Sequence, residues 1–257
     1  MIDTHTHLYD SRFDEDLGEV FSRAQAVGVT HYIIPDVDSS DREALERLVC
    51  AYPCCLPTVG LHPTSVNDNP LWREEMSDVA RKLSLAEFDY CAIGEAGLDL
   101  YWSRDYLTEQ IEALTMQLEL AVEYDLPIIL HVRDSWAEIF SVLEPFTGRV
   151  RGVFHSFSGS LEDFHRIVSL GGFMVGLGGT ITYKNSKLVD VVPHIPLENI
   201  LLETDSPYLP PVPYRGNRNE SSYLMIISEK IAQLQGVSGD LVRSVTTQNA
   251  MRMFDIG

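Results

Sequence analysis

Short apolar runs alternate with amphipathic segments along this chain, and the alternation limits the possible folds more than any other feature. Eight apolar runs of strand length occur, at residues 1–8, 31–35, 56–61, 90–95, 126–131, 152–155, 172–176 and 199–205. The segments between them place apolar residues at helical spacing, as at 106–124. Strands separated by helices pair in parallel through right-handed crossovers. The pattern predicts an α/β fold, a (β/α)8 TIM barrel, with an open doubly wound sheet as the alternative.

The length of the chain agrees with one barrel. It has 257 residues, and a barrel of this kind needs about 250. We expect a single domain over 1–257, with helices at 221–235 and 238–254 that add a C-terminal helix to the barrel. There is no apolar run near 18 residues, and the first strand begins at residue 2. We therefore expect no signal peptide, no membrane association and a cytoplasmic location.

Charge and cysteine content exclude some functions. The formal net charge is −19, which repels polyanions at long range and argues against a general nucleic-acid coat protein, although it permits a local cationic cleft. Cys50, Cys54, Cys55 and Cys91 form no Cys-x2-Cys pair. We predict reduced thiols rather than a zinc ribbon or a redox pair.

Histidines and carboxylates recur where the predicted strands end. His5 and His7 lie two residues apart on the first strand and therefore share a face. The six residues in such positions are His5, His7, Glu95, His131, His155 and Asp205. In a barrel these strand ends converge on one mouth. Six nitrogen and oxygen donors exceed the needs of one tetrahedral zinc, so we predict two divalent ions (zinc, magnesium or manganese) with Glu95 as the bridge.

A centre of this composition is suited to hydrolysis. Metal ions lower the pKa of bound water and neutralise charge on the attacked and leaving oxygens. A carboxylate that ligates metal and also contacts that water can accept its proton, which makes Asp205 the candidate general base.

Arginines near the same mouth favour an anionic substrate. Arg133 follows the fifth strand, and Arg215 and Arg218 follow the eighth. Their guanidinium groups match the geometry of phosphate or carboxylate. Tyr101 and Trp102 come just after the fourth strand, where they could stack on a base or cap the barrel.

Other polar or glycine-rich features have simpler interpretations. His31, His165 and His194 do not end strands, and we expect them on the surface or satisfied in the core. The glycine-rich run 175–179 lacks the spacing of a phosphate-binding loop, and we interpret it as a tight turn.

Motifs over nearly the whole length resemble those of the TatD-type deoxyribonucleases, a family of metal-dependent hydrolases similar to the wider amidohydrolase superfamily. The motifs are Asp3-Thr-His5-Thr-His7, Gly60-Leu-His62-Pro63, Gly94-Glu95-Ala-Gly97-Leu-Asp99, Leu126-Pro127 with His131-Val-Arg133, His155-Ser-Phe-Ser-Gly159, Glu203-Thr-Asp205-Ser-Pro-Tyr-Leu209, Arg215-Gly-Asn-Arg-Asn219-Glu220 and Asn249-Ala. Two positions differ from the family pattern: Ala96 stands where many relatives have Ile, and Ser221 replaces a Pro.

The resemblance implies a (β/α)8 barrel that binds two divalent ions and cleaves DNA, with single-stranded DNA or 3′ ends as plausible substrates. It assigns the metal to the same six residues that strand-end position selects. It also implies that His62 acts in catalysis or substrate binding and that Glu203 is a supporting carboxylate.

Two other functions are compatible with the same residues. One is an amidohydrolase-type hydrolase of a small amide, lactone or ester. Relatives of that type that use a carbamylated lysine need one at a strand end, and none of Lys82, Lys184, Lys187 and Lys230 ends the fourth strand. The other is a metal-binding protein without catalysis. Nothing in the sequence indicates an obligate protein partner.

Overall fold

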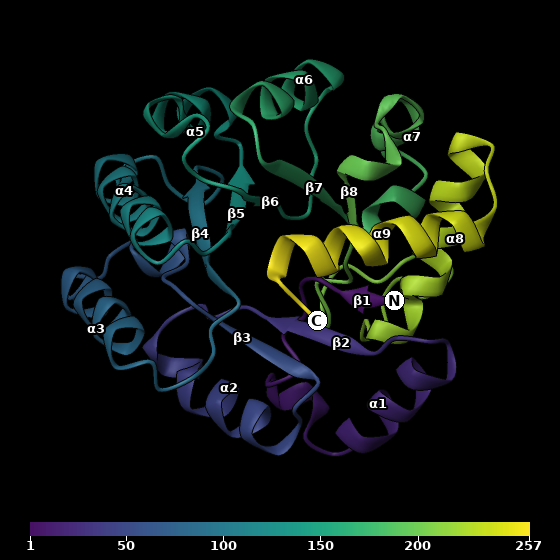
Figure 1. Ribbon diagram of the computed structural model, residues 1–257, viewed down its shortest axis with the longest axis horizontal. Helices are drawn as coiled ribbons and strands as arrows, with labels where there is room; N and C mark the ends of the chain where they lie inside the picture. Colours follow the sequence, from purple (N-terminus) through teal and green to yellow (C-terminus); the bar gives the residue numbers. More distant parts are fainter.

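Eight parallel strands form one sheet in sequential order, as the computed structural model of residues 1–257 shows (Figure 1). They are β1 (Ile2–Asp3), β2 (His31–Ile34), β3 (Cys55–Val59), β4 (Ala92–Asp99), β5 (Ile128–Arg133), β6 (Gly152–Phe154), β7 (Phe173–Leu177) and β8 (Ile200–Leu202). The sheet curves back on itself, because the Thr4 N–H donates to the Leu202 carbonyl at 3.0 Å and Thr6 forms a parallel bridge with Ser206. The predicted barrel is confirmed, and the open sheet is excluded.

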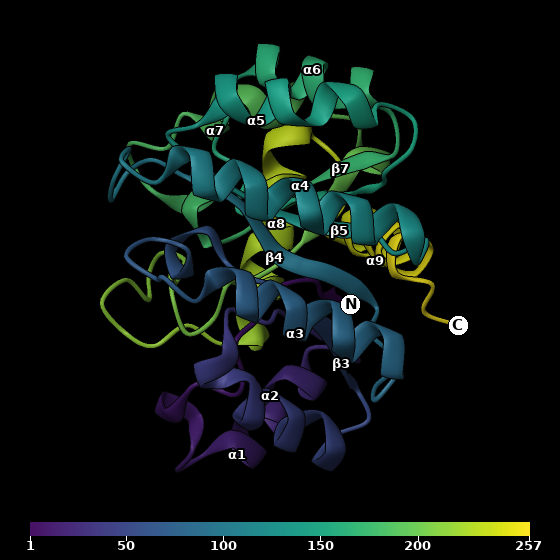
Figure 2. The same ribbon diagram turned by 90° about the vertical axis from the view of Figure 1, so that its left-hand side faces the viewer.

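Helices surround the strands. They are α1 (Leu17–Ala26), α2 (Ser39–Ala51), α3 (Trp72–Leu85), α4 (Leu107–Glu123), α5 (Trp136–Leu143), α6 (Leu161–Leu170), α7 (Leu188–Val191), α8 (Leu224–Gln235) and α9 (Gly239–Phe254). Figure 2 shows α2 to α6 one above another along one side of the barrel. None of the helices combines the length and the apolar character needed to cross a bilayer.

Local capping explains where several helices begin. Ser160 and Asp163 form a capping box at the start of α6, each side chain accepting a backbone N–H of the other residue. A short 3-10 turn at Ser11–Phe13 precedes α1, and the Asp10 side chain accepts the Arg12 N–H at that turn. This local side-chain bond competes with regular helix at the start of the segment.

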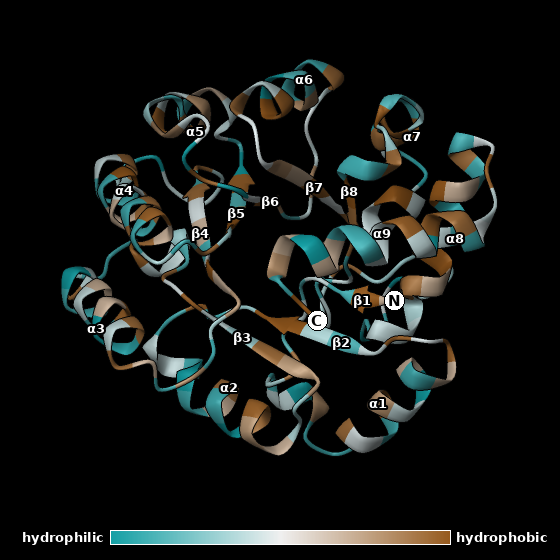
Figure 3. Ribbon diagram, in the orientation of Figure 1, coloured by the Kyte–Doolittle hydropathy of each residue, from teal (hydrophilic) through white to brown (hydrophobic).

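The hydrophobic core has two parts. A cluster of 51 buried residues fills the space between the strands and the surrounding helices. A second cluster of 10 combines residues such as Ile33, Ile129 and Leu201, on the strands, with Met253 and Phe254 of α9. Figure 3 shows the apolar colouring of the central strands and the polar outer surfaces of the helices. The C-terminal helix thus covers the end of the barrel where the strands begin.

Strand lengths differ from the sequence prediction at the residues of interest. β1 has two residues, so His5 and His7 lie in the segment after it; that segment bonds to the β8 end through the Asp205 N–H to the His5 carbonyl at 2.9 Å and the His7 N–H to the Ser206 carbonyl at 2.8 Å. β8 likewise stops at Leu202, before Asp205. The expected strands 1–8 and 199–205 were therefore too long.

β4 shows the opposite difference, because it continues past Glu95 to Asp99. Its register against β5 shifts between Ile93 and Ala96, which is the signature of a bulge. Gly94 has a φ of 135°, a conformation that other residues rarely adopt. At this bulge the Glu95 N–H donates to the carbonyl of Asp36 at 2.8 Å, and Asp36 lies just after β2, two strands away in the sheet.

The glycine-rich run 175–179 is not the tight turn that we expected. Its first residues belong to β7, and Gly179 begins a 3-10 helix at Gly179–Thr182. A Cβ at Gly176 would overlap the carboxylate of Glu203. The glycine is required for this close approach rather than for a turn.

Candidate metal centre

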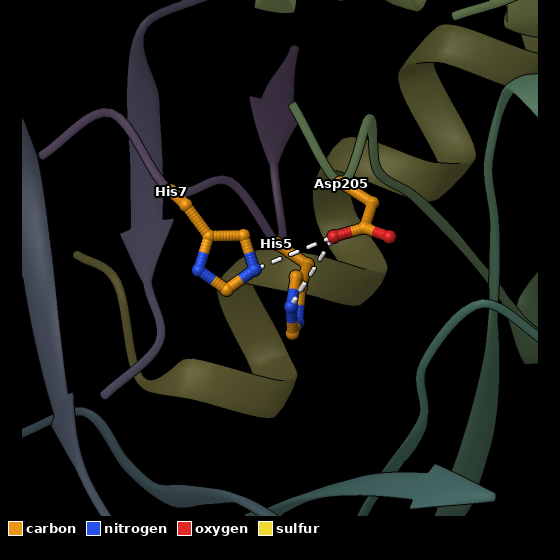
Figure 4. Close-up of side chains that lie close together, drawn as sticks. All are labelled: His5, His7 and Asp205. Atoms are coloured by element: carbon orange, nitrogen blue, oxygen red, sulfur yellow. Dashed lines mark ion pairs between the residues drawn. The ribbon is translucent and has the colours of Figure 1, made fainter. Parts of the chain in front are cut away.

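His5, His7 and Asp205 meet where the first and last strands come together (Figure 4). The Asp205 Oδ1 lies 3.4 Å from the His7 Nε2 and 3.9 Å from the His5 Nε2. Asp205 has a φ of 56°, in the left-handed region that Asp and Asn tolerate better than other side chains. The three donors share a space that a single cation could occupy.

Glu95 lies at the middle of the centre. Its Oε2 is 3.2 Å from the His5 Nε2, and its Oε1 faces three other imidazoles. The Oε1 distances are 2.9 Å to the His131 Nδ1, 3.1 Å to the His155 Nε2 and 3.3 Å to the His62 Nε2. One carboxylate therefore contacts donors on two sides, which is the geometry that a bridging ligand needs.

Two further carboxylates lie behind the centre. His131 directs its Nε2 to the Asp99 Oδ2 at 2.9 Å, and His155 directs its Nδ1 toward the Glu203 Oε1 at 3.5 Å. A carboxylate on the far nitrogen fixes the orientation of a metal-binding imidazole and increases its basicity. The fold supplies both partners from strand ends or the residues just after them: Asp99 ends β4, and Glu203 follows β8.

His62 reaches the centre from the loop after β3. Its Nδ1 accepts the Thr64 N–H at 3.2 Å at the start of a 3-10 turn, and this contact turns the Nε2 toward Glu95. His62, Glu95 and His131 form a third group of closely spaced donors, beside the groups His5–His7–Asp205 and His5–Glu95–His155. All six residues expected to ligate metal lie within these groups, together with His62.

The protonation and pairing of these groups fit divalent ions. Both ring nitrogens of His5 are buried without a hydrogen bond, a costly state that a cation beside the Nε2 would relieve. Burial lowers the pKa of His5, which keeps it in the neutral form that ligates metal. Burial alone would raise the pKa of Glu95, but the surrounding imidazoles, His155 first, outweigh it and hold that pKa well below its usual range. Burial would lower the pKa of His155, but the carboxylates of Glu95 and Glu203 outweigh burial and raise it well above its usual value. Positive charge is therefore favoured around the buried Glu95 anion, and divalent cations would supply it.

The centre forms the floor of two adjoining cavities at the mouth of the barrel. One has a volume of about 670 Å³ and is bordered by segments that follow β1 to β4, including Asp41 and His62. The other has about 730 Å³ and is bordered by segments that follow β5 to β8, including Tyr183 and Arg215. Each is within the range of roughly 300–1,000 Å³ that is typical of ligand sites.

The arginines proposed from the sequence lie in different places. Arg133 borders both cavities, with its guanidinium 3.7 Å from the Tyr101 ring centre, and Arg215 borders the second, over Tyr183 at 4.2 Å. Arg218 borders neither cavity; its Nη1 and Nη2 donate to the Asp16 carboxylate at 2.6 and 2.8 Å. The prediction that Arg218 binds substrate therefore gains no support from its position, because its donors bind Asp16.

The aromatic pair after β4 does not cap the barrel. Trp102 is 68% exposed and Tyr101 is 54% exposed, and Trp102 borders the first cavity. Both rings lie at the rim, near Arg133. Of the two interpretations, an exposed face that can stack on a base fits this position.

Four residues of the site had no role assigned from the sequence. Asp99 belongs to a quoted motif at a strand end, and that position was a usable signal. Tyr9 places its hydroxyl 2.9 Å from the His7 Nδ1, and Lys184 and Lys187 border the second cavity. These three lie on loops, where no periodicity marks them.

The remaining histidines and the cysteines lie outside the centre. His165 and His194 are exposed, and the His31 Nδ1 lies 3.0 Å from the Thr30 hydroxyl. All four cysteines are free thiols. The hydrogen bond with Cys55 lowers the pKa of Cys54 to about 7.

Known proteins similar to this chain match its whole length. The family of TatD related DNases matches residues 2–255. A metal-dependent hydrolase of Bacillus subtilis (strain 168), YabD, is 36% identical over 258 residues, covering 100% of this chain and 99% of its own. A protein of Pectobacterium carotovorum named 3′-5′ ssDNA/RNA exonuclease TatD is 33% identical over 264 residues, covering 99% of each. The crystal structure of YJJV, a TatD homolog from Escherichia coli, superposes with a TM-score of 0.93 at 31% identity, covering 100% of this chain and 98% of that one. The chain therefore belongs to the TatD-related DNase family of metal-dependent hydrolases.

Proposed function

We propose that this hydrolase cleaves phosphodiester bonds in single-stranded DNA at a centre of two divalent ions. The observation that carries the proposal is the position of Glu95, which contacts His5 on one oxygen and three other imidazoles on the second. We assign one ion to His5, His7, Glu95 and Asp205, and the other to Glu95, His131 and His155. Zinc, magnesium and manganese all suit a mixed set of imidazole and carboxylate donors.

Bound ions would lower the pKa of the attacking water and neutralise charge on the phosphate oxygens. The carboxylate of Asp205 would accept the proton of that water. Burial raises its pKa, but the hydrogen bond from His7 and the nearby imidazoles outweigh burial, so the pKa is lowered and the group stays ionised as a base must. Its side chain is 17% exposed, at the floor of both cavities.

The substrate is oriented by groups around the same floor. Arg133 and Arg215 offer guanidinium donors to phosphate oxygens, and neither has a carboxylate partner in the protein. His62 borders the first cavity and is near enough to Glu95 to contact either the phosphate or the metal. Trp102 offers an exposed ring for stacking on a base.

Replacing Asp205 by Asn tests this assignment. Asn tolerates the left-handed backbone at 205, so we expect a folded protein. Loss of the base should lower the rate of cleavage of a labelled single-stranded oligonucleotide by about 10²- to 10⁴-fold. The measurement is kcat with magnesium, manganese or zinc, after the metal content of the purified protein has been determined.

Asp255→Asn is a matched control, because Asp255 is exposed and also has a positive φ, of 52°. It should leave kcat unchanged. Cleavage by Asp205→Asn at the wild-type rate would contradict the assigned mechanism. Rapid turnover of a small ester, amide or lactone, with none of DNA, would instead support the amidohydrolase-type alternative.

A further inference from the structure

The two cavities at the mouth carry opposite charge. The cavity after β1 to β4, here called the acidic half, has Asp10, Asp14 and Asp41 at its border, in addition to the carboxylates of the centre. Its cations are Arg47 and Arg133, and Arg47 is paired with Glu43. The cavity after β5 to β8, here called the basic half, has four cations at its border, and its only carboxylate is Asp205.

The four cations of the basic half are Arg133, Lys184, Lys187 and Arg215. Of the 19 lysines and arginines, 11 form ion pairs with carboxylates within 4.0 Å, and these four do not. Half of the eight unpaired cations therefore border one edge of the active site, in a protein with a net charge of −19. Their charge remains available to an anionic ligand.

The acidic half has the opposite property. Asp14 and Asp41 have no cationic partner, whereas Asp10 is paired with Arg12 at 2.7 Å. Burial and the neighbouring carboxylates of Asp38 and Asp10 raise the pKa of Asp41, so its surroundings already disfavour negative charge. A run of phosphates on this side would meet further repulsion.

We propose that the polynucleotide strand leaves the centre over the basic half, where Lys184 and Lys187 bind the phosphates beyond the scissile one. This proposal rests on the proposed function and adds the path of the strand to it. The two lysines lie on the loop between β7 and α7, outside the donor groups around Glu95. They therefore act on long substrates and not on the chemical step.

The test compares substrates of different length. We choose the thymidine dinucleotide, which has one phosphodiester, and a thymidine decamer, and we measure kcat/KM between 50 and 200 mM NaCl. The slope of log(kcat/KM) against log[NaCl] is negative, and each lost phosphate contact on a single strand reduces its magnitude by about 0.7. The double variant Lys184→Ala/Lys187→Ala should therefore reduce the magnitude of the slope for the decamer by about 1.4. Between 50 and 200 mM NaCl its kcat/KM should then fall by about sevenfold less than that of the wild type. Its activity on the dinucleotide should equal that of the wild type.

Lys230→Ala/Arg252→Ala is the matched control, because both residues lack a carboxylate partner and border neither cavity. It removes the same charge and should leave the slope unchanged. A second comparison is Asp14→Asn/Asp41→Asn, which should not weaken cleavage of the decamer. Equal slopes for the lysine variant and the control would overturn the strand path, as would a loss of decamer cleavage confined to the aspartate variant. If the wild type hydrolyses neither oligonucleotide, the proposed function itself is wrong and the strand path falls with it.

Discussion

His131 is held between two carboxylates, and this placement gives Asp99 an effect on the metal without contact to it. The His131 Nδ1 lies 2.9 Å from the Glu95 Oε1, and its Nε2 lies 2.9 Å from the Asp99 Oδ2. Asp99 is itself fixed, since its Oδ1 accepts the Tyr101 N–H at 3.0 Å and its backbone N–H donates to Gln110 at 2.9 Å. The imidazole therefore has one preferred orientation.

Replacing Asp99 by Asn should weaken metal binding by about 10- to 100-fold, because the amide cannot supply the negative charge that makes His131 a stronger donor. Titration calorimetry with manganese or zinc measures the effect on the metal-free protein. Asp105→Asn is the control, since Asp105 is exposed on the loop that follows Asp99 and forms no ion pair. Unchanged affinity in Asp99→Asn would show that His131 does not depend on this partner.

The residues of the centre could be predicted because a barrel brings its strand ends together. To predict that His131 and His155 belong to the centre, it was enough to identify an apolar run and the polar residue at its end. Arg218 could not be placed in this way. Its sequence position near Arg215 is the same whether the side chain faces the substrate or Asp16, and only the packing of the loop against α1 decides between them.

At the scale of elements, strand boundaries also depend on contacts between distant segments, which the sequence does not reveal. β4 extends to Asp99 because a bulge at Gly94–Glu95 lets the strand resume its pairing with β5, and no local propensity marks a bulge. β1 stops after Asp3 because the next residues bond to the end of β8, a partner about 200 residues away. The order of strands and helices follows from periodicity, whereas their ends depend on such contacts.

The loop after β8 is fastened to α1 by a small ion-pair network. Arg218 and Arg23 both donate to Asp16, and Arg23 also donates to Glu220 at 2.8 Å. Arg218→Ala should lower the free energy of unfolding by about 1 kcal/mol, as expected for a partly exposed pair. Urea unfolding measures this cost. The salt dependence of decamer cleavage should not change, whereas an altered salt slope would return Arg218 to the substrate site.

The pH dependence of this network has a definite sign. Hydrogen bonds from Arg218 and then Arg23 lower the pKa of Asp16 to about 2, below its ordinary value of 3.8. A lowered pKa contributes stability above pH 3.8, and this contribution is lost as the pH falls through about 2. The difference in urea midpoint between the wild type and Arg218→Ala should therefore shrink between pH 5 and pH 2. A difference that stays constant over this range would show that Asp16 is not the partner concerned.

At the scale of the whole molecule, the barrel separates function from stability. The donors lie where the strands end, and α9 packs where they begin. Asn249 anchors that helix by donating to the Leu197 and Ile200 carbonyls at 2.8 and 2.9 Å, next to the start of β8. The charge of the protein, −19 in total, is also unevenly distributed, because the basic half has unpaired cations and lies beside the acidic half.

This separation predicts that the far end of the barrel can be weakened without affecting catalysis. Phe254 is 4% exposed and packs in the cluster under the strands, so Phe254→Ala should cost about 3–5 kcal/mol of unfolding free energy. Met251→Ala is the control on the same helix, because Met251 is 40% exposed and its truncation should cost about 0.5 kcal/mol or less. Urea unfolding gives both values, and kcat measured well below the melting temperature should match the wild type in each variant. A folded Phe254→Ala protein with a reduced kcat would show that α9 controls the geometry of the mouth through the strands, and the two ends would then not be independent.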